Sequence, residues 1–179
     1  MLKTQEHIHS LINLLSKSSK EDYTEILLNF NFDAIDFSEI EFWEPQCYTR
    51  NCFYKDENFE LILICWDKGL QTAIHNHDGE DCWVYLLEGE LEEDFYQLDE
   101  NEQLKYCSSN NLKPKQVTKS EELKDFHRLR NGEKARAMSI HVYAKPIEHS
   151  LTYDERLGKL VDKKLKYDTF KSVVSTQVL

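Results

Sequence analysis

Short strand-like segments separated by polar turns occupy the chain from about residue 46 onward, and this pattern restricts the possible folds more than any other feature. The segments are, in chain order, "QCYTRNCFYKD", "FELILICWD", "TAIHNH", "CWVYLLEGELEEDFYQL", "LKYCSS", "KPKQVTKS", "DFHRLRN" and "ARAMSIHVYAK". Turn-forming stretches such as "DKG", "DGED" and "RNGEK" divide them. So many short strands at close spacing are typical of an antiparallel sandwich or barrel.

The stretch before the strands carries a helical pattern, because apolar residues recur at intervals of three and four between residues 4 and 30. Ser18 or Ser19 is a candidate cap for a second helix, since acidic residues follow both. We therefore expect a mainly β protein with N-terminal α-helices. The expected organisation is a single domain over 1–179, with a helical part at 1–45, a β-barrel at 46–154 and a C-terminal extension at 155–179 in which "TFKSVVSTQV" is a candidate last strand.

The composition argues against several classes of partner. Lys and Arg total 22 against 33 Asp and Glu, and a net charge of −11 disfavours nucleic acid and anionic membranes. We expect no membrane span and no signal peptide, because no long apolar run is present. Five cysteines without a C-x-x-C pair argue against a disulfide framework, so a reducing cytoplasm is the expected location. A monomer is the default expectation, since nothing in the sequence fixes an oligomeric state.

Two histidines one residue apart interrupt the predicted strand "TAIHNH". In a strand, residues two apart face the same side, so His75 and His77 are expected to project together. Two imidazoles on one face commonly begin a metal site. The alternatives for an H-x-H pair alone are a solvent-exposed pair or a hydrogen-bonded core histidine.

The wider spacing resembles the first motif of the cupin superfamily, G-x5-H-x-H-x(3,4)-E-x6-G. Gly69, His75, His77, Cys82 and Gly89 occupy its positions, with Cys82 where glutamate is usual. This resemblance implies a jelly-roll β-barrel that holds a metal inside.

The second cupin motif ends in H-x3-N, which "FHRLRN" supplies with His127 and Asn131. The resemblance implies that His127 joins His75 and His77 as the third metal ligand. Without the glutamate these are three neutral imidazoles, a set that suits a substrate bringing its own negative charge.

The cysteine at the glutamate position points to one branch of the superfamily. The chain resembles the cysteine dioxygenases over residues 45–154, through "YTRN", "LILICW", "IHNH", Cys82, "FHRLRN" and "SIHVY". That resemblance implies Fe(II) as cofactor and the oxidation of L-cysteine with O2 to cysteine sulfinic acid, with cysteine bound through its thiolate and amine. Spacing alone leaves zinc, nickel and manganese open.

The resemblance also implies a substrate-binding pair. The Arg50 guanidinium suits a two-pronged clamp on the substrate carboxylate, and Tyr48, two residues away, adds a hydroxyl. A surface cation is the alternative for an arginine in a strand. The related mercaptopropionate dioxygenases typically carry glutamine at this place, so Arg50 favours cysteine.

Alternate residues of "SIHVY" share one strand face. The functional hypothesis is a hydrogen-bond relay in which Ser139 orients His141 and His141 bonds the Tyr143 hydroxyl, which helps order oxygen and substrate. The family resemblance further implies a thioether crosslink between Cys82 and Tyr143. The alternatives are a solvent-facing polar stripe and, for Cys82, a buried small thiol.

Two other functions stay open at this point: a dioxygenase for another small thiol such as 3-mercaptopropionate, and a non-catalytic metal-binding cupin. The carboxylates of "EGELEED" are expected to form a charged edge or turn with no part in the site.

Overall fold

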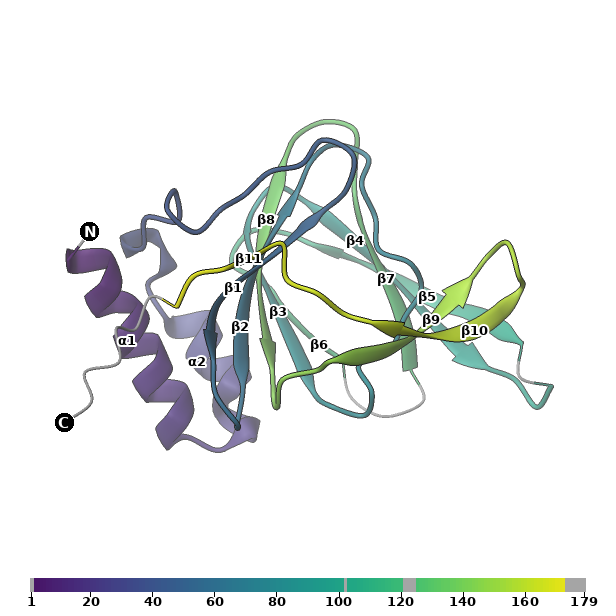
Figure 1. The fold of residues 1–179 in the computed structure, drawn as a ribbon, viewed down its shortest axis with the longest axis horizontal. Helices are drawn as coiled ribbons and strands as arrows, with labels where there is room; N and C mark the ends of the chain where they lie inside the picture. The colour runs from purple at the N-terminus through teal and green to yellow at the C-terminus, as the bar shows by residue number, and fades with distance from the viewer. Residues whose placement is uncertain (1, 102, 121–124, 173–179) are drawn as a thin grey trace.

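The computed structural model describes residues 2–101, 103–120 and 125–172 and shows a barrel of β-strands with helices at one end (Figure 1). The helical part contains α1 (Leu2–Lys17), η1 (Lys20–Asp22), α2 (Tyr23–Asn29) and η2 (Phe32–Ala34). The strands are β1 (Thr49–Lys55), β2 (Glu60–Trp66), β3 (Cys82–Glu88), β4 (Leu91–Leu98), β5 (Leu104–Leu112), β6 (Val117–Ser120), β7 (Asp125–Asn131), β8 (Ala137–Tyr143), β9 (His149–Asp154), β10 (Lys159–Lys164) and β11 (Thr169–Phe170). Within those described residues, no helix is long and apolar enough to cross a membrane.

The barrel consists of two layers, which confirms the prediction of a mainly β, antiparallel barrel. One layer is a six-stranded sheet in the order β11-β1-β2-β8-β3-β6. The other contains β5-β4-β7 and the hairpin β9-β10. Residues 70–76 lie between these two groups, because His75 forms bridges to His127 on β7 and to Thr152 on β9. The segment that carries the first two histidines is thereby held between two strands.

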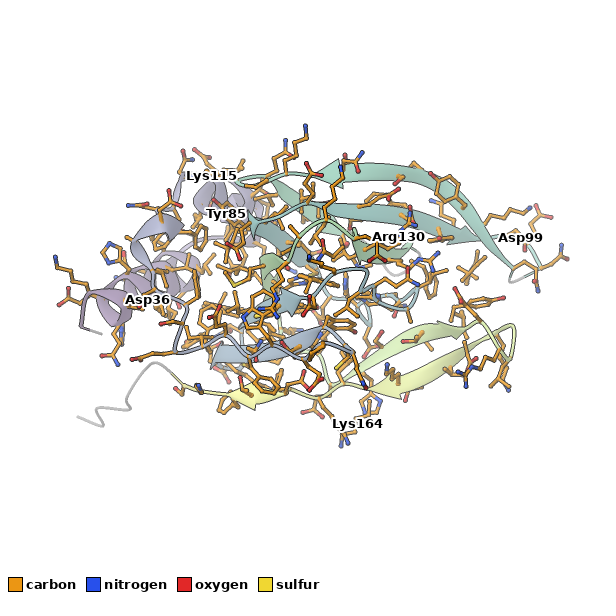
Figure 2. All side chains as sticks on the ribbon, turned by 90° about the horizontal axis from the view of Figure 1, so that it is seen from above. Asp36, Tyr85, Asp99, Lys115, Arg130 and Lys164 are labelled. Atoms are coloured by element: carbon orange, nitrogen blue, oxygen red, sulfur yellow. The ribbon has the colours of Figure 1, made fainter. Side chains whose placement is uncertain are left out.

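The large sheet is buried on both faces. On β8, Ile140 and Val142 belong to the apolar cluster that contains the helix residues Leu11, Leu15 and Leu27. Tyr143, on the opposite face of the same strand, belongs to the cluster inside the barrel. Figure 2 shows side chains filling the space between the layers, with Tyr85 at the helical end and Lys164 on the outside of β10. Strand alternation therefore directs one set of residues to the helices and the other to the barrel interior.

The helical part differs from the prediction in where its second helix begins. Ser19 precedes the short 3-10 turn η1, and Asp22 stands before α2; neither side chain forms a capping hydrogen bond. The first helix presents the predicted apolar face, with Ile8 and Leu11 fully buried. The helical prediction is thus confirmed, although the caps are not.

The predicted strand "TAIHNH" is not a regular strand. His75 forms only isolated bridges, and the backbone hydrogen bonds of Thr72, His75 and Asn76 go to β7 and β9. The segment is nevertheless fixed by these bonds on both sides, so its histidines still face the barrel interior.

The C-terminal extension contributes more structure than expected. Its strand β10 pairs with β9, which lies at the end of the predicted barrel region, in a hairpin that was not predicted; β11 pairs in parallel with β1, with Asn51 opposite Thr169. Of the candidate last strand 169–178, residues 169–170 form β11 and 173–179 lie outside the described residues. The Asp168 carboxylate accepts a hydrogen bond from the backbone N–H of Arg50 at 2.7 Å. The extension is therefore attached to the strand that carries the predicted substrate-binding arginine.

Candidate functional site

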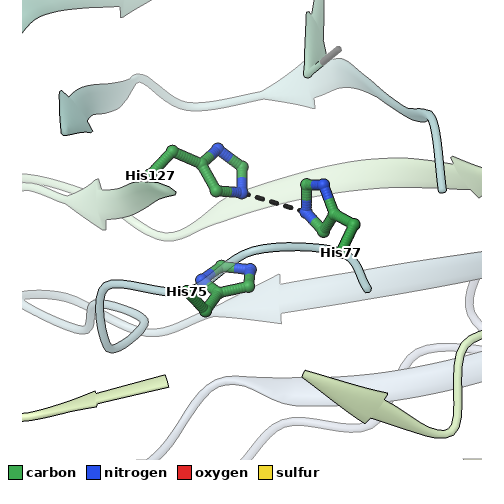
Figure 3. A group of neighbouring side chains, drawn as sticks. All are labelled: His75, His77 and His127. Carbon is green, nitrogen blue, oxygen red and sulfur yellow. Dashed lines mark hydrogen bonds between the residues drawn. The ribbon is translucent and has the colours of Figure 1, made fainter. Parts of the chain in front are cut away.

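Three histidines from two separate parts of the chain meet inside the barrel (Figure 3). His75 and His77 come from the segment before β3, and His127 comes from β7. One ring nitrogen of each lies within 4.8 Å of the others. The Nε2 atoms of His77 and His127 are 3.0 Å apart. The predicted cluster is thus present, with His77 and His127 buried and His75 partly exposed.

Hydrogen bonds on the outer side of two rings fix their orientation. His75 Nδ1 lies 3.0 Å from the carbonyl oxygen of Ala73, and His127 Nδ1 lies 2.6 Å from Oε1 of Glu93. A carbonyl and a carboxylate only accept, so each Nδ1 carries the hydrogen and donates it. The Nε2 atom of each ring then keeps its lone pair, which is the form in which histidine binds metals.

Burial keeps the first two rings neutral. It lowers the pKa of His75 to about 3, and the nearby His127 lowers it further. Burial likewise holds the pKa of His77 well below its usual value, again with a contribution from His127. Metal-binding histidines must be uncharged, so these rings need lose no proton to bind at neutral pH. Three converging imidazoles, two of them with oriented outer nitrogens, fit a divalent first-row metal ion.

One acidic residue next to the cluster contradicts the sequence prediction. The carboxylates of "EGELEED" were expected to form a charged edge, but Glu93 is fully buried and bonds His127. The signal available in the sequence was its alternation with Leu91 on β4, since both occupy buried positions of that strand. A glutamate at an inward position of a strand is expensive unless it has a partner there.

Arg50 also lies in the interior, which excludes the surface-cation alternative. Its Nη1 lies 3.4 Å from the Tyr143 hydroxyl, while buried Nε and Nη2 have no hydrogen-bond partner among the described residues. A buried guanidinium with free N–H groups is ready to bind an anion. Arg50 lines a small cavity, and the other lining residues come from both layers and from the C-terminal extension. The lining residues are Tyr48, Arg50, Ile64, Thr72, Ala73, His75, Leu129, His141, Tyr143, Ile147, Ser150, Thr152, Lys163 and Leu165.

Tyr143 lies between the arginine and the histidine cluster. The centroids of the Tyr143 and His77 rings are 5.5 Å apart. The guanidinium carbon of Arg50 lies 5.6 Å from the centroid of the Tyr143 ring. Cys82 is its direct partner across the β3–β8 pair. Directly opposed residues have neighbouring Cβ atoms, so the two side chains are within reach of each other. Burial raises the pKa of both the Cys82 thiol and the Tyr143 phenol, so both groups are neutral at pH 7.

The predicted relay is only partly formed. Ser139 Oγ lies 3.0 Å from Nε2 of His141, as expected, but Nδ1 of His141 has no hydrogen-bond partner among the described residues. The expected bond from His141 to the Tyr143 hydroxyl is therefore not formed, and the two rings stack at 6.2 Å instead. Strand alternation puts both on one face, yet ring orientation depends on neighbours that alternation does not specify.

Trp66 is a neighbour of that kind. Its indole N–H donates to Ser139 Oγ at 2.9 Å, and its ring stacks on Tyr48 at 5.1 Å. Trp66 thereby links the predicted substrate-binding tyrosine to the Ser139–His141 pair. This role was not predicted, because an indole donor has no spacing rule that identifies its acceptor.

Asn131, the last residue of the second cupin motif, has a structural role. Its side-chain amide donates to the backbone carbonyls of Trp66, Asp67 and Ala135. These bonds connect the end of β7 with the end of β2 and the loop before β8.

Comparisons with known proteins agree with this arrangement. A family profile described as "Cysteine dioxygenase type I" matches residues 2–156. The chain is 30% identical to cysteine dioxygenase type 1 of Rattus norvegicus and 26% identical to that of Homo sapiens, each over 77% of this chain and 71% of the relative.

Solved structures agree on the fold. The cupin domain of Schizosaccharomyces pombe Cnp3 is 11% identical, with a TM-score of 0.51 over 63% of this chain and 73% of that one. A protein with a double-stranded β-helix domain from Klebsiella pneumoniae is 14% identical, with a TM-score of 0.50 over 62% of this chain and 88% of that one. The predicted cupin barrel is confirmed, and the chain belongs to the cysteine dioxygenase type I family.

Proposed function

We propose that this protein is an Fe(II)-dependent dioxygenase that oxidises L-cysteine with O2 to cysteine sulfinic acid. Both oxygen atoms go to sulfur, which loses four electrons while O2 gains four. The observation that carries the proposal is the placement of Arg50: a buried guanidinium with two free nitrogens opens on the same cavity as His75. Family membership supports the reaction class.

In this proposal His75, His77 and His127 hold the iron, and none brings a negative charge. Bound Fe(II) supplies one site at which a thiolate and O2 are held side by side. Three neutral ligands favour a substrate that contributes its own charge, as the cysteine thiolate does.

Arg50 binds the substrate carboxylate through its free N–H groups, and the Tyr48 hydroxyl adds a further bond. Tyr143 lies between Arg50 and His77, so its hydroxyl is placed beside a substrate that spans the two. Ser139 holds His141, whose free Nδ1 adds a donor in the lining of the cavity. The protein's contribution is to hold carboxylate and sulfur at fixed positions.

We also propose that Cys82 and Tyr143 become joined by a thioether bond. The new bond joins Cys82 Sγ to a carbon of the Tyr143 ring; one S–H and one ring C–H bond break, and O2 takes up the two hydrogens with their electrons to give hydrogen peroxide. The support is their direct pairing across β3 and β8, which makes the two side chains neighbours. Mass spectrometry of a tryptic digest would detect a branched peptide lighter by two hydrogens; two separate peptides after repeated turnover would contradict the crosslink.

A cytoplasmic location and a monomeric state remain predictions. All five cysteines are free thiols in the structure, which suits a reducing compartment. Partners in this proposal are the small molecules L-cysteine and O2, with neither nucleic acid nor membrane.

The test is oxygen uptake by iron-loaded protein, with the product identified by mass spectrometry. We expect uptake with cysteine and a product heavier by two oxygen atoms. A clear preference for 3-mercaptopropionate in the same assay would establish the other thiol dioxygenase instead. Iron binding without oxygen uptake for any small thiol would indicate a non-catalytic metal-binding cupin.

A further inference from the structure

Glu93 is the residue whose placement the proposed reaction leaves unexplained. Its side chain is fully buried on β4, and Oε1 accepts a hydrogen bond from His127 Nδ1 at 2.6 Å. Oε2 is buried and has no hydrogen-bond partner among the described residues. A buried carboxylate with an unbonded oxygen destabilises the folded protein. A contribution to folding stability alone is therefore a poor explanation for the burial of Glu93.

The neighbouring acidic residues show what an ordinary ion pair on this strand involves. Glu92 and Asp94 both lie within 3.1 Å of Arg130, and Asp94 also approaches Arg128. Glu93 has no arginine or lysine partner among the described residues; its ion-pair contact is to His127. The Glu93 carboxylate therefore faces the histidine cluster, whereas the carboxylates of Glu92 and Asp94 pair with arginine on the other side of the sheet.

The cluster lacks a negative charge of its own. Among the described residues its donors are three imidazoles, with no carboxylate or thiolate. A divalent ion held there by neutral ligands keeps its full charge in a poorly polarisable interior, where a nearby opposite charge has a large effect. Glu93 is the buried carboxylate in contact with one of those ligands.

We propose that Glu93 is a positioning residue that fixes the His127 ring and supplies the negative charge of the metal centre from behind that ligand. A carboxylate on the outer nitrogen of a metal-bound histidine orients the ring and raises its basicity, and loss of such a partner typically costs about 10- to 100-fold in metal affinity. The proposal rests on divalent metal binding by the three histidines, and on no property of the thiol substrate.

Three variants separate charge from packing. Glu93→Gln keeps size and an acceptor oxygen but removes the charge, and Glu93→Asp keeps the charge at a greater distance. Asp94→Asn is the matched control, because it removes an adjacent buried carboxylate that contacts none of the three histidines. The measurement is the dissociation constant of Zn²⁺, obtained with the metal-free proteins in competition with a chromophoric chelator, and repeated with Fe²⁺ under anaerobic conditions.

We expect Glu93→Gln to weaken both metals by about 10- to 100-fold, Glu93→Asp to weaken them less, and Asp94→Asn to match the parent. Circular dichroism establishes that each variant is folded, and the spectrum of the Co²⁺-loaded protein reports a changed ligand field at His127.

Parental affinity in Glu93→Gln would overturn the proposal, since the charge would then have no role. So would weaker binding by Glu93→Asp than by Glu93→Gln. If Glu93→Gln fails to fold, the comparison of Glu93→Asp with Asp94→Asn remains, and equal affinities there overturn the proposal. A parent protein that binds no divalent metal would overturn the proposed function as well, whereas metal binding without oxygen uptake leaves the role of Glu93 standing.

Discussion

Arg50 combines burial with unused hydrogen-bond donors, and the proposed recognition of the substrate carboxylate depends on this combination. Arg50→Ala removes one or two charge-assisted hydrogen bonds, worth about 1.5–3 kcal/mol each, to the substrate carboxylate. We therefore expect KM for cysteine to rise by about tenfold to a thousandfold, measured by oxygen uptake. Arg136→Ala is the control, because Arg136 pairs with Asp67 away from the cavity. A cysteine dependence equal to that of the parent would remove Arg50 from the site.

His127 is the member of the histidine cluster that comes from β7, whereas the other two come from the segment before β3. His127→Ala removes one of three donors and leaves the Glu93 carboxylate without its partner. We expect loss of iron retention and of activity with the barrel still formed, measured as iron per protein after desalting. His149→Ala is the control, since that histidine is exposed and pairs with Asp162. Iron at the parental ratio in His127→Ala would contradict the three-histidine centre.

The site residues that belong to a motif of fixed spacing were predictable from the sequence. Site residues outside such a motif were not. The positions of His75, His77 and His127 follow from motifs, and Arg50 from a family resemblance. Glu93 and Trp66 were missed because their partners lie 34 and 73 residues away, on other strands. The alternation with Leu91 indicates an inward position for Glu93, but the local sequence does not identify the histidine that it bonds.

At the scale of elements, the C-terminal extension is attached by a buried acid. The Tyr167 hydroxyl donates to Glu60 Oε2, and Glu60 Oε1 accepts from the backbone N–H of Ile147. Glu60 is itself fully buried and lies opposite Tyr143 in the β2–β8 pair. Burial raises the pKa of this carboxyl, and the bond from Tyr167 partly opposes that rise.

Tyr167→Phe should therefore destabilise the protein, because it leaves a buried carboxylate oxygen without its donor. We expect a loss of about 1–3 kcal/mol in the free energy of unfolding at neutral pH, measured by urea denaturation. The variant raises the folded-state pKa of Glu60 further, so its deficit should shrink as the pH falls and Glu60 becomes protonated in both proteins. Tyr106→Phe, at a 60% exposed position, should have no effect. A deficit independent of pH would mean that Tyr167 acts through packing alone.

Most strands were predictable because one or both of their faces are apolar. The hairpin β9-β10 was missed because most of its side chains are at least partly exposed, so its sequence carries no clear alternation. Residues 72–77 were predicted as a strand and form only bridges, because each edge of the segment bonds a different partner strand. Both departures depend on long-range pairing, which a local pattern does not encode.

At the scale of the molecule, the buried histidines couple folding to pH. The pKa of His75 falls from 6.5 to about 3 on folding, and that of His77 also falls well below 6.5. Below pH 6.5 these two rings become protonated in the unfolded chain but stay neutral in the folded protein. The unfolding free energy of the metal-free protein should therefore decrease as the pH falls below about 6.5, by up to about 1.4 kcal/mol per pH unit for His75 down to a pH of about 3, and His77 adds to the decrease in the same direction.

The matched comparison is the double variant His75→Gln with His77→Gln, in which all other titrating groups are retained. Its stability, measured by urea denaturation between pH 7 and 4, should depend less steeply on pH than that of the parent. Equal slopes in the two proteins would mean that the folded rings take up protons as readily as the unfolded ones.

The sheet with helices on one face and the cavity on the other has a consequence for how the site responds to heat. Val142 belongs to the apolar cluster that includes the helices, and its chain neighbours His141 and Tyr143 line the cavity. One stretch of β8 backbone therefore holds residues of both the helical cluster and the cavity. Loosening of the helices would remove the support on the outer side of that backbone while the strands are still paired. Warming should then blunt catalysis at temperatures where the barrel is still intact.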